Sequence, residues 1–275
     1  MTGEARAIAR ASRPATVATL TADLRALGVR PGMVLLVHAS LSALGYVVSG
    51  AHSVILALEA AVGEAGTLVM PAHSSDLSDP AFWQHPPVPA EWWDDIRAGM
   101  PAFDPDLTVT RQMGVIAETF RKQAGARRSW HPRDSFAARG PQAEFITAGH
   151  TLAFGLGEGS PLARVYDLDG WVLLLGVGHG NNTSLHLAEA RAEWPAKRVY
   201  REGSPVLVDG QRQWVTYEDW DAGAEDFERL GADFARETGL EGAGRVALAE
   251  ARLMSQRAVV DYAARWLAQN RGART

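Results

Sequence analysis

A histidine and a glutamate three positions apart are the residues best suited to acid–base chemistry in this chain. His186 and Glu189 lie in NTSLHLAEARAEW, which predicts a helix with Asn or Thr as its N-cap. Residues at this spacing share one helix face, so the carboxylate can orient the imidazole or stabilise its charged form. The positive helix end nearby opposes protonation and keeps the ring able to accept a proton. The pattern fits a general base, but it fits an ordinary structural or surface pair as well.

Acidic residues gather in two places where a cation would be attracted. The first group contains six acids with no intervening base, namely Glu218, Asp219, Asp221, Glu225, Asp226 and Glu228. The second group is Asp76 and Asp79 in SSDLSDP. A negative rim concentrates a polycation near a site. The alternatives are a solvated acidic helix face for the first group and turn-forming residues for the second.

A loop with two serines is suited to holding a phosphate or an amide chain. Ser40 and Ser42, with Gly45 behind them, lie between a predicted strand and a predicted helix. Their hydroxyls and the backbone amides can receive a phosphate or the amides of a pantetheine chain. No G-x-S-x-G sequence indicates a serine hydrolase, and no H-E-x-x-H accompanies His179 and His186 as metal ligands. Because no metal motif accompanies these histidines, no metal is expected. The chain has no cysteine, which excludes thiolate nucleophiles and sulfur-ligated metal clusters.

The composition of the 275 residues narrows the class of protein further. A formal net charge of -5 and a pI near 5.9 argue against nucleic acid as the main partner, because such proteins carry a clustered basic face. A cationic partner fits better. The hydrophobic fraction of 47% supplies a sizeable core. Neither a secretory signal nor a run of about 18 apolar residues occurs, which predicts a cytoplasmic protein with no membrane partner.

Three short apolar runs predict the strands that would position these residues, at 34–37, 67–70 and 171–177. Helical spacing predicts helices at 16–27, 54–62, 114–123 and from about Asn182. This alternation predicts an α/β layered fold with parallel strand pairs. The strands end in the polar loops HASLSALG, AHSSDLSD and GHGNNTSLH. If the strands are neighbours, these loops share the sheet edge where ligands bind.

The rest of the chain carries weaker patterns. Residues 72–112 hold many prolines and tryptophans without a regular period, which predicts a long ordered excursion of functional importance. Asp209-Gly210 predicts a β-hairpin over 206–216. A long amphipathic helix is predicted over 246–267. We expect a single domain over 1–275, with the excursion as an inserted segment on the substrate side.

Five segments of the chain occur in this order: LLVHASLSALG, AGTLVMPAHSSDLSDP, DPDLTVTRQMGVIAETFR, RRSWHPRDSFAARGP and SPLARVYDLDGWVLLLGVGHGNNTSLHLAE. Together they resemble the aminoglycoside 3-N-acetyltransferase family, from about Leu20 to past residue 230. The resemblance implies a three-layer α/β/α sandwich with a mixed, largely parallel central sheet, unlike the other common acetyltransferase superfamily. It also implies that acetyl-coenzyme A acetylates the 3-amino group on the 2-deoxystreptamine ring of aminoglycoside antibiotics, which confers resistance.

The resemblance also implies roles for individual residues. His186 is the implied base that takes a proton from the attacking amine, in a direct transfer without a covalent enzyme intermediate. Glu189 is the glutamate of the same motif, and Asp219 is expected to orient the histidine or to hold a substrate ammonium. The residues expected to contact substrate are Asp76, Trp92, Asp221 and Glu225. The residues expected near coenzyme A are Ser40, Ser42, Thr110, Arg111 and Ser135.

Two other functions stay open at this point. The chain could be an enzyme of the same family that acetylates an amine other than an aminoglycoside. It could also be a non-catalytic protein that sequesters cationic antibiotics through its acidic surface. A homodimer is one assembly open to either kind of protein.

Overall fold

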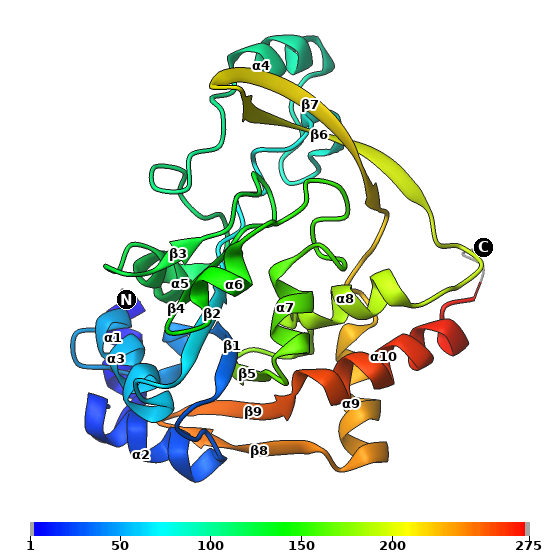
Figure 1. Ribbon diagram of the computed structural model, residues 1–275. Helices are drawn as coiled ribbons and strands as arrows, with labels where there is room; N and C mark the ends of the chain where they lie inside the picture. Colours follow the sequence, from blue (N-terminus) through cyan, green and yellow to red (C-terminus); the bar gives the residue numbers. More distant parts are fainter. Residues whose placement is uncertain (1–2, 273–275) are drawn as a thin grey trace.

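The structure is a computed structural model that describes residues 3–272. Within these residues, a seven-stranded mixed sheet runs through the body of the protein in the order β3-β4-β2-β1-β5-β9-β8 (Figure 1). Its strands are β1 (Val34–Ala39), β2 (Thr67–Pro71), β3 (Arg127–Arg128), β4 (Phe136–Arg139), β5 (Trp171–Leu175), β8 (Glu241–Val246) and β9 (Ala249–Ser255). The predicted α/β fold with a mixed central sheet is confirmed.

Helices cover both faces of this sheet, which makes it the middle of three layers. One face carries α2 (Val17–Leu27), α3 (Ala51–Val62) and α5 (Gly114–Arg121). The other face carries α6 (Ala143–Thr147), α7 (Pro161–Asp167), α8 (Ser184–Arg191), α9 (Phe227–Thr238) and α10 (Gln256–Asn270). A hydrophobic cluster fills the space on each side, with Leu58 and Phe120 in the first and Leu185 and Phe234 in the second.

The three predicted strands form the parallel centre of the sheet. β1 lies between β2 and β5 and pairs parallel with both, so that Leu36 faces Val69 on one side and Val172 on the other. Their continuous apolar runs are buried because helices cover both faces. The carboxyl ends of the three strands therefore meet at one edge, as predicted. The other pairings within this seven-stranded sheet are antiparallel, so the parallel part is smaller than expected.

The long helix predicted over 246–267 is wrong in its first part. Residues up to Ser255 form the end of β8 and all of β9, and α10 begins only at Gln256. β9 pairs antiparallel with β5 along its length, and its side chains alternate between buried and more exposed positions up to Leu253. Pairing with a central strand outweighs the helix preference of an alanine- and leucine-rich segment. The Ser255 side chain then caps α10 by accepting a hydrogen bond from the Ala258 amide.

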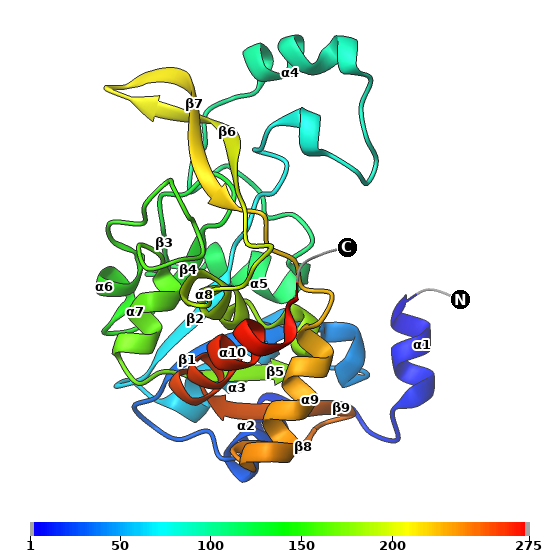
Figure 2. The same ribbon diagram turned by 90° about the vertical axis from the view of Figure 1, so that its right-hand side faces the viewer.

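A two-stranded hairpin projects from the body of the protein (Figures 1 and 2). It consists of β6 (Val199–Val208) and β7 (Gln211–Trp220) and is longer than predicted. Asp209 and Gly210 form its turn with φ angles of 50° and 74°. Positive φ at both central residues is what a type I′ turn requires, and Asp-Gly tolerates it.

The excursion over 72–112 lies beside this hairpin. It contains η2 (Pro80–Phe82), η3 (Ala90–Trp92) and α4 (Trp93–Gly99) and no strand, as predicted. The Arg212 side chain of β7 donates a hydrogen bond to the Met100 carbonyl at 3.0 Å, which ties the excursion to the hairpin. Among residues 3–272, no helix is both long and apolar enough to cross a membrane.

Candidate active site

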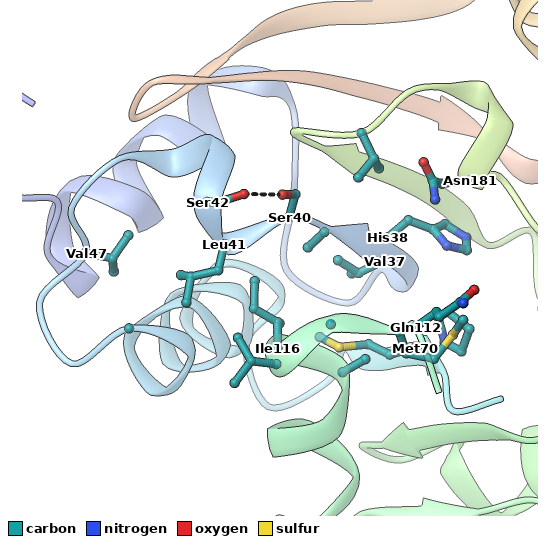
Figure 3. A pocket seen from close by; sticks show the side chains of 18 of the residues that line it. Val37, His38, Ser40, Leu41, Ser42, Val47, Met70, Gln112, Ile116 and Asn181 are labelled. Carbon is teal, nitrogen blue, oxygen red and sulfur yellow. Dashed lines mark hydrogen bonds between the residues drawn. The ribbon is translucent and has the colours of Figure 1, made fainter. Parts of the chain in front are cut away.

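A cavity of about 960 Å³ opens at the edge where β1, β2 and β5 end (Figure 3). Its walls are formed by the loops after β1 and β5, by the last two residues of β2, by the start of α5, and by α1 (Gly3–Arg10) and η1 (Leu41–Leu44). His186, in the first turn of α8, lies in the wall. Two of the three polar loops that the sequence placed at one edge, HASLSALG and GHGNNTSLH, therefore line a space of ligand size. The third loop, AHSSDLSD, contributes no residue to this wall, so that part of the prediction is wrong.

A glycine lets two of these loops approach closely. Gly176, directly after β5, has a φ of +71°, and a Cβ atom there would lie 2.4 Å from the Cβ atom of Ala43. Only glycine fits both the backbone conformation and the contact. The Ser40 amide bonds to the Leu175 carbonyl at 2.9 Å just before this point. The end of β5 is thus held against the serine loop, and the chain then turns toward α8.

His186 and Glu189 form the contact that their spacing predicts. Nδ1 of the imidazole is hydrogen-bonded to Oε2 of Glu189, and the ring packs 5.0 Å from the ring of Phe227. The imidazole is 23% exposed, whereas the Glu189 side chain is 1% exposed. Because Glu189 occupies Nδ1, Nε2 is the nitrogen that can exchange a proton with a molecule in the cavity.

Glu189 is itself held by groups from distant parts of the chain. Its Oε1 accepts a hydrogen bond from the Gly223 amide at 3.3 Å and one from the Arg271 guanidinium. Each carboxylate oxygen therefore has its own partner: Oε2 faces His186, and Oε1 faces Arg271. A buried carboxylate with both oxygens occupied is fixed in orientation.

His38, near the end of β1, is a second histidine in the cavity wall, and it is not among the site residues predicted from the sequence. It is buried, and its Nε2 lies 3.3 Å from Oγ1 of Thr183. Burial lowers its pKa, and together with the nearby His73 and His186 it brings the pKa to about 3. His38 is therefore neutral at physiological pH and can only take part as a hydrogen-bonding group. One sequence feature could have indicated a role for His38: it is the first polar residue after the apolar run at 34–37.

The serine loop lies where the sequence placed it. Ser40 and Ser42 line the cavity, with their hydroxyl oxygens 3.1 Å apart, while His38, Gln112 and Asn181 lie farther along the wall (Figure 3). Both hydroxyls are free to bond to a ligand in addition to each other.

The other residues expected near coenzyme A are not part of the cavity wall. Ser135 is fully buried, and its hydroxyl donates to the Ala72 carbonyl at 2.8 Å. The Thr110 hydroxyl donates to Glu118 at 2.8 Å. Arg111 is half-exposed next to the start of α5. The hydroxyls of Ser135 and Thr110 thus bond to other groups of the protein. A sequence motif alone does not show whether a hydroxyl bonds to the protein or to a ligand.

Asp219 does not contact His186. It lies on β7, is buried, and forms an ion pair with Arg133. Burial raises its pKa, although the charge of Arg133 acts in the opposite direction. Glu189, and not Asp219, is therefore the carboxylate that orients the imidazole in this structure.

The residues expected to contact substrate lie outside the cavity wall. Asp221 and Glu225 are exposed on the segment between β7 and α9. Asp76 is half-exposed, 4.0 Å from Arg111, and its Oδ1 has no hydrogen-bond partner. Trp92 is 55% exposed at the end of η3. Within residues 3–272, no three histidine or carboxylate side chains come together in a way that would hold a metal ion.

Comparison with known proteins gives consistent matches over nearly the whole chain. The family model described as Aminoglycoside 3-N-acetyltransferase matches residues 36–268. The "SPbeta prophage-derived aminoglycoside N(3')-acetyltransferase-like protein YokD" of Bacillus subtilis is 44% identical over 258 residues, which cover 94% of each protein. Aminoglycoside N(3)-acetyltransferase VII of Streptomyces paromomycinus is 38% identical over 277 residues, which cover 96% of this chain and 95% of that enzyme.

Solved structures match equally well. The crystal structure of YokD from Bacillus subtilis has a TM-score of 0.94 at 42% identity, over 97% of this chain and 98% of that one. AAC-IIIb, solved as a binary complex with CoASH, has a TM-score of 0.84 at 33% identity, over 96% and 100%. AAC-VIa bound to sisomicin has a TM-score of 0.85 at 33% identity, over 95% and 100%.

Proposed function

The chain belongs to the aminoglycoside 3-N-acetyltransferase family, and from this membership we propose that it acetylates the 3-amino group of aminoglycoside antibiotics with acetyl-coenzyme A, which confers resistance. The observation that carries the proposal is the pair of His186 and Glu189 in the wall of a cavity large enough for a coenzyme. The pair supplies a base, and the cavity supplies the place where donor and acceptor meet.

In the proposed reaction, Nε2 of His186 takes a proton from the acceptor amine while the amine nitrogen attacks the acetyl carbonyl carbon. Acetyl-coenzyme A supplies the acetyl group as a thioester, so a C–N bond forms as the C–S bond breaks. The proton on His186 can then pass to the departing sulfur, which restores the neutral base. Glu189 keeps the Nδ1–H tautomer in place and stabilises the charged ring between these steps. No covalent enzyme intermediate is needed.

The cavity suits the donor. Its volume of about 960 Å³ lies at the upper end of the range for small-molecule sites. Ser40 and Ser42 offer hydroxyls suited to the amides of a pantetheine chain, and the binding of CoASH by AAC-IIIb supports the same use here. The neutral His38 at the inner end of β1 adds a polar group without a charge.

The proposed acceptor, an aminoglycoside, rests on the net charge of this chain and on a ligand bound to a related enzyme. An aminoglycoside carries several ammonium groups, and this chain has a net charge of -5. Asp221 and Glu225 are exposed carboxylates, and Asp76 is half-exposed. All three would attract such a molecule, adding more to the association rate than to affinity. AAC-VIa was solved with sisomicin, which supports the same class of acceptor.

The direct test is thiol release from acetyl-coenzyme A with gentamicin, tobramycin and apramycin as separate acceptors. We expect release with at least one of them, and acetylation of its 3-amino group by NMR. The His186→Ala variant should lose about 10²- to 10⁴-fold in kcat, the range that a general base supplies. Thiol release with other amines, but with no aminoglycoside, would instead indicate a different acceptor within the family. If His186→Ala still protected cells and still bound the drug, sequestration would replace catalysis as the function.

A further inference from the structure

The guanidinium of Arg271 lies directly behind the His186–Glu189 pair. Arg271 follows the end of α10, more than 80 residues after Glu189, and its Nη1 donates to Oε1 of that glutamate. Nε and Nη2 donate to the two carboxylate oxygens of Asp226 at 2.8 and 2.6 Å, and Nη2 also donates to the Gly223 carbonyl at 2.6 Å. One side chain thus joins the base's carboxylate to the segment between β7 and α9.

This side chain is built into the protein. Its exposed fraction is 12%, and its guanidinium carbon lies 5.1 Å from the centre of the Trp194 ring and 5.9 Å from that of Phe227. Phe227 also packs against the imidazole of His186. Burial by itself would lower the pKa of Arg271, but the bonds to Asp226 and Glu189 outweigh it and raise the pKa. The guanidinium is therefore a fixed positive charge.

A carboxylate bonded to a histidine through one oxygen can still rotate about its terminal bond, which would take the oxygen away from Nδ1. In this protein the second oxygen is held by a planar donor that is itself held by Asp226. Arginine suits this task because its donors are rigidly arranged, so little freedom is lost on bonding. We propose that Arg271 is a positioning residue for the His186–Glu189 pair, fixing the Glu189 carboxylate so that Oε2 stays on the imidazole. The proposal rests on the proposed role of His186 as the base.

The positive charge of Arg271 also acts on the pair, because it lies against the carboxylate that bonds to the imidazole. The charged or titratable groups that face the pair are His38 from β1, His73 from the loop after β2, Asp226 before α9, and Arg271. Removing the positive charge of Arg271 leaves Glu189 free to stabilise the imidazolium, so protonation occurs at a higher pH. Removing the negative charge of Asp226 has the opposite effect.

The experiment compares Arg271→Gln, Arg271→Lys and Asp226→Asn with the wild type. In Arg271→Gln, kcat should fall by about 10- to 100-fold with an unchanged KM for acetyl-coenzyme A, as expected for a misplaced catalytic group. The acid limb of kcat/KM should move to higher pH by about one unit. Arg271→Lys keeps the charge and should restore the position of the acid limb and part of kcat. Asp226→Asn should move the acid limb to lower pH.

Arg257→Gln is the matched control, because it removes an arginine from the other end of α10. Arg257 forms an exposed ion pair with Asp169 at 3.0 Å, in the first turn of α10, whereas Arg271 follows the last turn. Its kcat and pH profile should equal those of the wild type, and thermal unfolding should show that all variants are folded.

An NMR titration of the His186 imidazole, assigned with His186→Gln, gives a readout that does not depend on turnover. If no amine is acetylated even by the wild type, the proposed function fails, but the titration still shows whether Arg271 governs the pair. A loss of kcat in Arg271→Gln with an unchanged titration would mean that Arg271 is only structural, and the proposal would be wrong. If Arg271→Gln does not fold, an unchanged titration in Asp226→Asn would overturn the proposal as well.

Discussion

At the scale of single residues, the central feature is the choice of carboxylate beside His186. From the sequence, either Glu189 on the same helix or Asp219 in the acidic stretch could have been this carboxylate. The tertiary structure decides between them. Glu189 lies on the same face of α8 and is buried against the imidazole, whereas Asp219 is paired with Arg133. A spacing of three residues on a helix guarantees proximity, but closeness to a distant strand residue depends on the fold.

We predict that Glu189→Gln lowers kcat by about 10²- to 10⁴-fold while the protein stays folded. A glutamine has no charge to stabilise the imidazolium, and its amide NH₂ can donate to Nδ1 and so fix the tautomer that leaves no acceptor toward the cavity. Steady-state kinetics measure the effect. Glu193→Gln, an exposed change just after α8, is the control and should leave kcat unchanged. A Glu189→Gln enzyme with wild-type kcat would refute the role of this carboxylate.

At the scale of elements, one arginine from the body of the protein contacts both strands of the projecting hairpin. Arg133, from the turn between β3 and β4, donates to the Tyr200 hydroxyl at 2.6 Å and to Glu202 at 2.8 Å on β6, and it pairs with Asp219 on β7. It also pairs with its neighbour Asp134. Burial opposes its charge, but the surrounding carboxylates outweigh burial and raise its pKa well above the usual value. The hairpin is thus held to the sheet domain by a buried ionic network.

We predict that Arg133→Met lowers the free energy of unfolding by about 3–5 kcal/mol, because it leaves buried carboxylates without a counter-charge. Urea denaturation followed by circular dichroism measures the change. Arg201→Met is the matched control, since Arg201 is exposed on β6, and it should change stability by less than about 0.5 kcal/mol. Equal stability of the two variants would show that the network contributes nothing to attachment.

At the scale of the whole molecule, several histidines are buried as neutral groups. Burial lowers the pKa of His38 and of His150 to about 3, and it lowers that of His131. His150 is fixed by the Ser129 hydroxyl at 2.9 Å and the Gly155 carbonyl at 2.7 Å. In the unfolded chain these side chains would titrate near pH 6.5. Acid therefore protonates the unfolded state before the folded one.

The consequence is a loss of stability on mild acidification. Where the folded pKa lies below the unfolded one, the unfolded state binds more protons, so the free energy of unfolding falls as the pH drops below about 6.5. Between pH 7 and pH 5 we expect a loss of about 2 kcal/mol for each histidine with a folded pKa near 3. Urea denaturation at a series of pH values measures this. His150→Gln should reduce the slope, and His52→Gln, at an exposed position, should not. A flat profile over this range would contradict the prediction.

The sequence by itself determined the features that depend on neighbours along the chain. Apolar runs located β1, β2 and β5 because strands covered on both faces exclude polar residues, and Asp-Gly located the hairpin turn because it tolerates positive φ. The helical spacing of His186 and Glu189 gave the pair, and the ordered segments gave the family. The inserted-segment boundaries and the roles of the separate site residues remain predictions.

Only the tertiary structure decided the features that depend on residues far apart in sequence. β9 is a strand because β5 offers it a partner, although its residues alone favour a helix. Ser135 and Thr110 are used inside the fold, and Asp219 belongs to Arg133, because hydrogen bonds go to whichever partner the fold brings near. Arg271 reaches Glu189 only once α10 has packed against α8. Such contacts produce no repeating pattern in the sequence, because the number of residues between the two partners depends on the path of the whole chain.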